Sequence, residues 1–200
     1  MSRTVNPSTI LQKNALPAAI IVITVLLMLG GNTVTDALRY QHDAIHDGQL
    51  WRLLTGNFVH LGWPHLGMNL AGLVLTWLLF GRLLSPGKWL TVLFVSSLGV
   101  SLGLLLFDPD LVWYVGLSGT LHGLFVAGAI ASIRAGYRLE WLLLLFLVGK
   151  LTWEQFNGAM PGSADLAGGT VIVNAHLYGA ISGLIVISGM LLYAHFRSRS

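Results

Sequence analysis

Three short clusters of polar residues interrupt an otherwise apolar chain, and each cluster contains a histidine. In the first, His65 and Asn69 are four residues apart, so they share one face if this segment is helical. The second cluster contains Ser118 and the third contains His176. A serine becomes a nucleophile when a neighbouring histidine accepts its proton. The clusters therefore predict acyl-transfer chemistry, with Ser118 as nucleophile and His176 as general base, if the fold brings them together.

A tetrahedral intermediate at a serine also needs hydrogen-bond donors near its oxyanion. The side chains of His65 and Asn69 can donate, as can backbone N–H groups at a helix start. The candidate aspartates, Asp108, Asp110 and Asp165, lie in connecting segments. The sequence therefore predicts a Ser–His dyad without an acidic third member.

The composition indicates where this chemistry would take place. Of the 200 residues, 54% are hydrophobic and only 10% are charged, against about 25% charged in an average globular protein. That is too little polar surface for a soluble domain. The absence of cysteine excludes disulfides and thiolate nucleophiles. A net charge of +3, spread over small groups, does not indicate nucleic-acid binding. We expect a single domain over residues 1–200 in a lipid bilayer, with no nucleic-acid partner.

Six apolar runs are about long enough to cross the roughly 30 Å hydrocarbon core of a bilayer. They are Ala15–Gly31, Pro64–Leu84, Trp89–Phe107, Leu117–Ile133, Tyr137–Trp153 and Val171–Phe196. Isolated strands would leave their backbone unpaired in lipid, so all six are predicted to be helices. The expected fold class is all-α, a polytopic bundle of six transmembrane helices. No small-residue cleavage site follows Gly30-Gly31, so the first run is interpreted as a retained anchor rather than a signal peptide. The connection over residues 32–50 could be an ordered interfacial segment.

Lysine and arginine gather on the cytoplasmic side of membrane proteins. With six spans, eight of the eleven basic residues fall on one side: Arg3, Lys13, Arg82, Lys88, Arg134, Arg138, Arg197 and Arg199. The other three are Arg39, Arg52 and Lys150. This asymmetry predicts that both termini are cytoplasmic, with short tails of about residues 1–14 and 197–200. Lys150 is expected to pair locally with Glu154, and neither is assigned a chemical role.

The same topology places the three polar clusters at one depth. The second, fourth and sixth helices would all run from outside to inside, so their N-terminal ends would lie together on the outer side. Small residues let membrane helices approach closely. Gly119 and Gly123 on the fourth helix, and Gly179 and Gly183 on the sixth, would allow a hydrogen bond between serine and histidine.

Read together, these motifs resemble the rhomboid family of intramembrane serine proteases. The matching residues are Trp51-Arg52, His60, His65, Asn69, Gly116-Leu117-Ser118-Gly119 and Ala175-His176 with Gly179 and Gly183. The resemblance implies a Ser118 nucleophile, a His176 base, and oxyanion stabilisation by His65 and Asn69. It also implies a tight turn at Gly116 and Gly119. Arg52 and His60 would be structural, with His60 holding the outer segment by a hydrogen bond.

One position departs from the common pattern. Many rhomboids have a tyrosine four residues after the serine, whereas this chain has His122, which we expect to pack against His176. This segment and Gly149–Gln155 resemble the rhombosortase branch of the family. That resemblance implies a bacterial inner-membrane enzyme with a periplasmic-facing site. Its substrates would be membrane-anchored proteins with a C-terminal tail that contains Gly-Gly and a transmembrane segment.

Three other functions remain open. The histidines could bind haem or a metal ion, but carboxylate companions and a His-Glu-x-x-His motif are missing, so we expect neither a metal nor a cofactor. The chain could be a general rhomboid protease with other substrates. It could also be a rhomboid-like protein that binds membrane clients without cleaving them, although such proteins usually lose the serine or the histidine.

Overall fold

The computed structural model describes the backbone of residues 7–198 and the side chains of residues 14–198. Six long helices account for most of this range: α1 (Pro7–Leu29), α5 (Trp63–Phe80), α6 (Pro86–Phe107), α7 (Ser118–Arg134), α8 (Glu140–Asn157) and α10 (Val173–Arg197). Four short helices connect them: α2 (Gly31–Leu38), α3 (His42–His46), α4 (Arg52–Thr55) and α9 (Ser163–Ala167). Arg3, Arg199 and the side chain of Lys13 lie outside the described residues.

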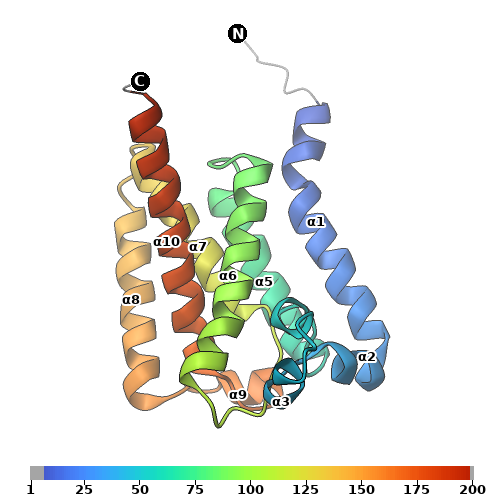
Figure 1. The fold of residues 1–200 in the computed structure, drawn as a ribbon. Helices are drawn as coiled ribbons and strands as arrows, with labels where there is room; N and C mark the ends of the chain where they lie inside the picture. The colour runs from blue at the N-terminus through green and yellow to red at the C-terminus, as the bar shows by residue number, and fades with distance from the viewer. Residues whose placement is uncertain (1–6, 199–200) are drawn as a thin grey trace.

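The six long helices lie close to the six predicted runs and alternate in direction. In Figure 1, α1 begins and α10 ends at the same end of the bundle, and α2, α3 and α9 lie at the opposite end. We call the latter the connector end. The N-terminal ends of α5, α7 and α10 all lie toward it, so the three polar clusters are at one end of the bundle.

Three described helices, α5, α6 and α10, are long and apolar enough to cross a membrane. A fourth span results if the described part of α1 (Asn14–Leu29) and α2, which meet at a bend of 116°, count as one. Two other long helices do not meet the same criteria of length and apolar character. The α7 helix has only 17 residues, and α8 carries the charged residues Glu140, Lys150 and Glu154. The protein is therefore a multi-pass membrane protein, and the count of six spans stays a prediction.

The connection between α1 and α5 is ordered. It contains α2, α3 and α4 and a two-residue strand, β1 (Tyr40–Gln41). This strand pairs antiparallel with β2 (Trp113–Tyr114), so that Tyr40 lies opposite Tyr114. The described chain is thus mostly helical, with this short ladder as an exception to the predicted all-α class.

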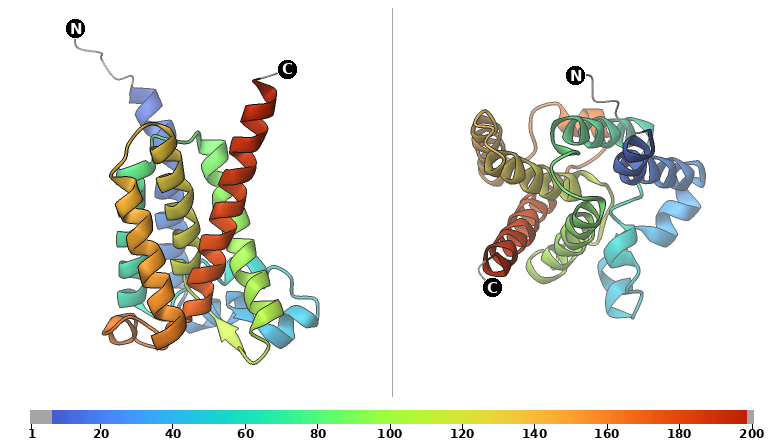
Figure 2. Two further views of the ribbon diagram at one scale, coloured as in Figure 1. Left: turned by 90° about the vertical axis from the view of Figure 1, so that its left-hand side faces the viewer. Right: turned by 90° about the horizontal axis from the view of Figure 1, so that it is seen from above.

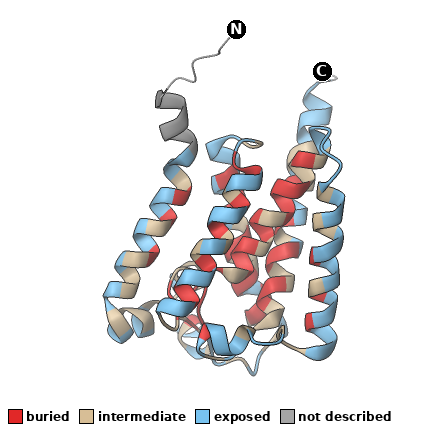
Figure 3. Ribbon diagram, turned by 180° about the vertical axis from the view of Figure 1, so that it is seen from behind, coloured by how far each residue is buried: buried red, intermediate tan, exposed pale blue. Residues whose placement is uncertain are grey.

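The α7 helix lies at the centre of the bundle. It packs against α5, α6, α8 and α10, whereas α1 packs on the outside against α5 and α6. Figure 2 shows this arrangement from the side and from above. In Figure 3 the buried residues gather on the inner helices, and the outer surfaces of α1 and α8 are mostly exposed. An apolar outer surface is expected for helices that face lipid.

Glycines make the contact between α7 and α10 unusually close. A β-carbon added at Gly119 would lie 2.7 Å from the carbonyl oxygen of Ala175. One at Gly179 would overlap the carbonyl of Gly119, and one at Gly183 would overlap the carbonyl of Gly123. The two backbones therefore touch directly, as the glycine spacing predicts.

Replacing Gly179 by Ala should weaken this contact, because the added methyl group has no space. We expect a loss of about 1–3 kcal/mol in unfolding free energy, which is typical of overpacking, and a lower unfolding temperature in detergent micelles. Gly189→Ala is the matched control, because a β-carbon at Gly189 on the same helix meets nothing within 4 Å. Equal unfolding temperatures for the two variants would contradict the close packing.

Candidate active site

Ser118 stands at the first residue of α7, directly after a turn that requires glycine. Gly116 has a φ of +125°, which side-chain-bearing residues rarely adopt. Its N–H donates to the carbonyl of Gly56 at 3.1 Å, and its carbonyl accepts from the hydroxyl of Tyr114 at 2.7 Å. A β-carbon here would lie only 2.7 Å from Cε1 of His65. Gly116 therefore shapes the turn and leaves room for the His65 ring.

His176 lies in the first turn of α10 and meets Ser118 across the glycine contact. Its Nε2 is 3.0 Å from Oγ of Ser118, within the range of a nucleophile–base pair. The His176 residue is only 5% exposed. The two residues that the sequence predicts as nucleophile and base thus share a hydrogen bond.

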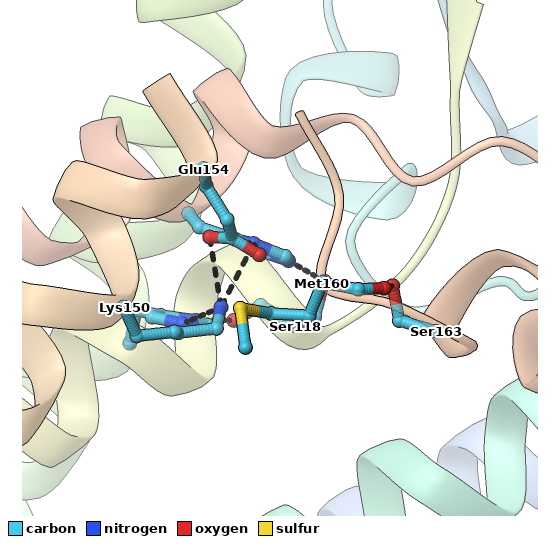
Figure 4. Close-up of polar contacts among 7 residues, drawn as sticks. Ser118, Lys150, Glu154, Met160 and Ser163 are labelled. Atoms are coloured by element: carbon cyan, nitrogen blue, oxygen red, sulfur yellow. Dashed lines mark hydrogen bonds and ion pairs between the residues drawn. The ribbon is translucent and has the colours of Figure 1, made fainter. Parts of the chain in front are cut away.

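The contact on the other side of the His176 ring was not predicted from the sequence. Nδ1 of His176 lies 2.9 Å from Oε2 and 3.1 Å from Oε1 of Glu154. Glu154 also forms the predicted ion pair with Lys150, at 2.9 Å. Figure 4 shows Lys150 and Glu154 reaching from α8 toward the start of α7. The expectation of a histidine without an acidic partner is therefore wrong.

A sequence signal for this cluster was present. Lys150 and Glu154 are four residues apart, which places them on one helix face. Ionisable residues within an apolar segment are rare, and by default they indicate a functional site. The spacing alone does not show that this face turns toward His176, because the rotation of α8 is set by tertiary packing.

His122 completes the cluster around His176. The two rings stack with centroids 4.3 Å apart and planes inclined by 16°, the packing contact that the sequence predicts. Nδ1 of His122 is 2.7 Å from the carbonyl oxygen of Ser118, so Nδ1 carries the proton and donates it. Nε2 then accepts from the ammonium of Lys150 at 2.8 Å.

His65 and Asn69 project from α5 into the cavity that contains Ser118. The N–H of Leu61 donates to Nδ1 of His65 at 3.4 Å, so the proton of this ring is on Nε2. The amide of Asn69 donates to the carbonyl of His65 at 3.1 Å, which leaves its second N–H available. Both side chains can therefore offer a hydrogen to an anion formed at the serine.

Two cavities meet at Ser118. The first has a volume of about 420 Å³ and is lined mainly by apolar side chains of α5, α7 and α8. The second, of about 500 Å³, lies between residues 111–115 and residues 167–172. Ser118 and His65 line both. Figure 4 also shows Met160 and Ser163 beside the site, and the hydroxyl of Ser163 donates to the carbonyl of Met160 at 2.6 Å.

Arg52 braces the connection before α5, as predicted. Its Nε donates to the side chain of Gln49 at 2.8 Å. One terminal nitrogen donates to the carbonyls of Asp36 and Arg39, at 2.9 and 2.8 Å. The guanidinium therefore ties α4 to α2.

The hydrogen bond expected of His60 is not formed: both ring nitrogens are buried, and neither has a hydrogen-bond partner among the described residues. The ring is buried and packs edge-on against His65, with centroids 5.1 Å apart. Burial, helped by His65, lowers the pKa of His60 to about 3, so the ring is neutral at physiological pH. His60 supports His65 through packing rather than through a hydrogen bond.

A buried network that the sequence did not reveal holds the loop next to the site. Asn57 donates to the carbonyl of Ser97 and to the hydroxyl of Ser101, both at 3.2 Å. It accepts from Thr120 at 3.1 Å. This network joins the segment before α5 to both α6 and α7, close to Ser118.

The one cluster of possible metal ligands among the described side chains is His122, Glu154 and His176, whose ligand atoms lie within 4.8 Å of one another. The ammonium of Lys150 contacts all three, at 2.8, 2.9 and 3.2 Å. A lysine cation therefore occupies the place that a metal ion would need, and the donor set fits a metal poorly.

Comparison with known proteins assigns the family. The family profile of the rhomboid domain matches residues 47–193. The chain belongs to the rhomboid family. It is 30% identical over 156 residues to "Rhomboid-like protein 11, chloroplastic" of Arabidopsis thaliana, covering 71% of this chain and 53% of that protein. It is 28% identical over 170 residues to "Rhomboid protease GlpG" of Serratia proteamaculans, covering 84% and 58%. The chain thus spans a little more than half the length of these curated relatives.

The turn at Gly116 gives a direct test of how His65 is placed. In Gly116→Ala, the positive φ and the contact with the His65 ring should together cost about 1–3 kcal/mol of stability. We also expect Ser118 to react at least tenfold more slowly with a fluorophosphonate, measured by intact-protein mass spectrometry.

The control for that test is Gly67→Ala on α5, because a β-carbon at Gly67 meets nothing within 4 Å. A reaction rate in Gly116→Ala equal to that of the control would show that the turn does not set the site geometry.

Proposed function

We propose that this protein is an intramembrane serine endopeptidase in which Ser118 attacks and His176 acts as the base. The observation that carries this proposal is the 3.0 Å contact between Oγ of Ser118 and Nε2 of His176 at the junction of two cavities. Membership of the rhomboid family and the similarity to rhomboid proteases GlpG support it.

In the first step, Nε2 of His176 takes the hydroxyl proton while Oγ of Ser118 bonds to the carbonyl carbon of the scissile peptide. The resulting oxyanion accepts hydrogen bonds from Nε2–H of His65, the amide of Asn69 and backbone N–H groups at the start of α7. The imidazolium then protonates the leaving amine as the C–N bond breaks. This leaves an acyl ester on Ser118, which water hydrolyses with His176 again as base.

The two cavities favour a membrane-anchored substrate. The cavity between α5, α7 and α8 is apolar and suits a transmembrane tail. The cavity between residues 111–115 and 167–172 lies at the connector end and suits a more polar, extended segment. A chain that passes from one to the other would place its scissile bond at Ser118.

The connector end would face away from the cytoplasm. Among the described basic residues, Arg82, Lys88, Arg134, Arg138 and Arg197 lie at the opposite end of the bundle, and this enrichment supports a cytoplasmic position for that end. This orientation requires six spans with both termini in the cytoplasm. In a bacterial inner membrane, the site would then open toward the periplasm.

Within the family we propose the rhombosortase type, which acts on C-terminal tails that contain Gly-Gly and a transmembrane segment. The residues that support it are His122, four positions after Ser118, and the stretch containing Lys150 and Glu154. The second candidate is a general rhomboid protease with other membrane substrates. A non-proteolytic client-binding protein is disfavoured, because it would not need the hydrogen bond between Ser118 and His176.

Ser118→Ala tests the proposed activity. The protein is co-expressed with candidate substrates that carry either a Gly-Gly tail or another transmembrane tail, and the new C-terminus is mapped by mass spectrometry. We expect cleavage by the native protein and a loss of about 10³-fold or more in the variant. The variant should keep its unfolding temperature.

The outcomes separate the candidates. Cleavage restricted to the Gly-Gly tail supports the rhombosortase type, and cleavage of the other tail alone supports the general protease. Substrate capture by both forms without cleavage by either would instead identify a client-binding protein.

A further inference from the structure

We propose that Glu154 is a positioning residue for His176, and that Lys150 would hold the base in its inactive form if Glu154 were absent. The inference rests on the proposed protease function and adds a third residue to its catalytic pair. The inference rests on two groups that both contact Nδ1 of His176. One of them, the carboxylate of Glu154, accepts hydrogen bonds, and the other, the ammonium of Lys150, donates them.

A histidine can act as a base through Nε2 only if its proton is on Nδ1. A carboxylate accepts hydrogen bonds, so Glu154, with oxygens 2.9 and 3.1 Å from Nδ1, requires Nδ1 to carry the proton. Nε2 is then free to accept from the hydroxyl of Ser118, 3.0 Å away. The contact with Glu154 therefore selects the active tautomer.

Lys150 has the opposite effect on the same atom. The protonated ammonium of Lys150 can only donate, and its Nζ lies 3.2 Å from Nδ1. A bond from Lys150 would make Nδ1 an acceptor and move the proton to Nε2, where it blocks removal of the proton from Ser118. In the native protein, Nζ donates to His122 and Glu154 at 2.8 and 2.9 Å. For its third N–H to bond Nδ1, it must compete with the Glu154 carboxylate, which lies closer to that atom, at 2.9 Å against 3.2 Å.

The cluster is largely buried, with one side on the apolar cavity at Ser118. The side chain of Glu154 is 2% exposed and that of Lys150 is 19% exposed. The ring of His122 covers one face of His176. Nδ1 is buried and contacts both Glu154 and Lys150, so the choice between these two partners decides its state.

The experiment uses the full chain in detergent micelles or vesicles and compares four proteins: native, Glu154→Ala, Lys150→Met, and the double variant. The measurements are kcat and KM for a cleaved tail substrate, the rate of fluorophosphonate labelling of Ser118, and the unfolding temperature. Glu154→Ala should lower kcat and the labelling rate on the order of 10²–10⁴-fold, as expected when the base has the wrong tautomer. KM should stay within about twofold, because Glu154 does not contact the substrate.

The double variant is the decisive arm. Without Lys150 no donor remains to hold the inactive tautomer, so kcat and labelling should recover at least about tenfold relative to Glu154→Ala. A purely structural role predicts the reverse, since removing a second buried group would lower activity and unfolding temperature further. A double variant no more active than Glu154→Ala would overturn the proposal.

Glu140→Gln is the matched control, because Glu140 is a hydrogen-bonded acid on the same helix that accepts from Ser132 at 2.8 Å, outside this cluster. It should keep native kcat. If the native protein neither cleaves nor labels, the proposed function fails. If the native protein is active and Glu154→Ala matches it within twofold, the inference alone fails.

Discussion

The direct contact between the backbones of α7 and α10 is the constraint on which the rest of this structure depends. In lipid the hydrophobic effect does not drive helices together, so van der Waals contact and interhelical hydrogen bonds must do so. Glycines 119, 123, 179 and 183 remove the side chains that would separate these two helices. Ser118 and His176 stand at the same end of this contact. A hydrogen bond of 3.0 Å between them is a consequence of the helix spacing, not of flexible side chains.

The ion pair of Lys150 and Glu154 is the costly part of the arrangement. Removing two charges from water carries a desolvation penalty that their attraction offsets only partly, and the penalty is larger in an apolar membrane segment. Each charge here has further polar partners, the carboxylate in His176 and the ammonium in His122. The four groups therefore depend on one another, and removing one partner leaves another buried without compensation.

Much of the architecture could be predicted from local features. The run Trp89–Phe107 ends where α6 ends, and Val171–Phe196 agrees with α10 to within two residues. The meeting of Ser118 and His176 followed from alternating helix direction and the glycine spacing. The contact of Glu154 with His176 did not, because it depends on how α8 is rotated, and nothing local specifies that. The hydrogen bond expected of His60 failed for a related reason, since tertiary packing buries the ring against His65 and leaves both ring nitrogens without a partner in the described part of the chain.

Exposure alone does not identify where the proposed protease would take in a substrate, because the lipid-facing surfaces of membrane helices are apolar everywhere. Phe146 on α8 and Leu75 on α5 are 73% and 54% exposed, but so are comparable residues far from the site. What distinguishes these two is that they line the same cavity as Ser118 and His176. The reacting atoms belong to the tightly packed pair α7 and α10, whereas much of the remaining cavity wall comes from α5 and α8. If the proposed function holds, a fold divided in this way would keep the geometry of Ser118 and His176 fixed while a substrate tail packs against α5 and α8.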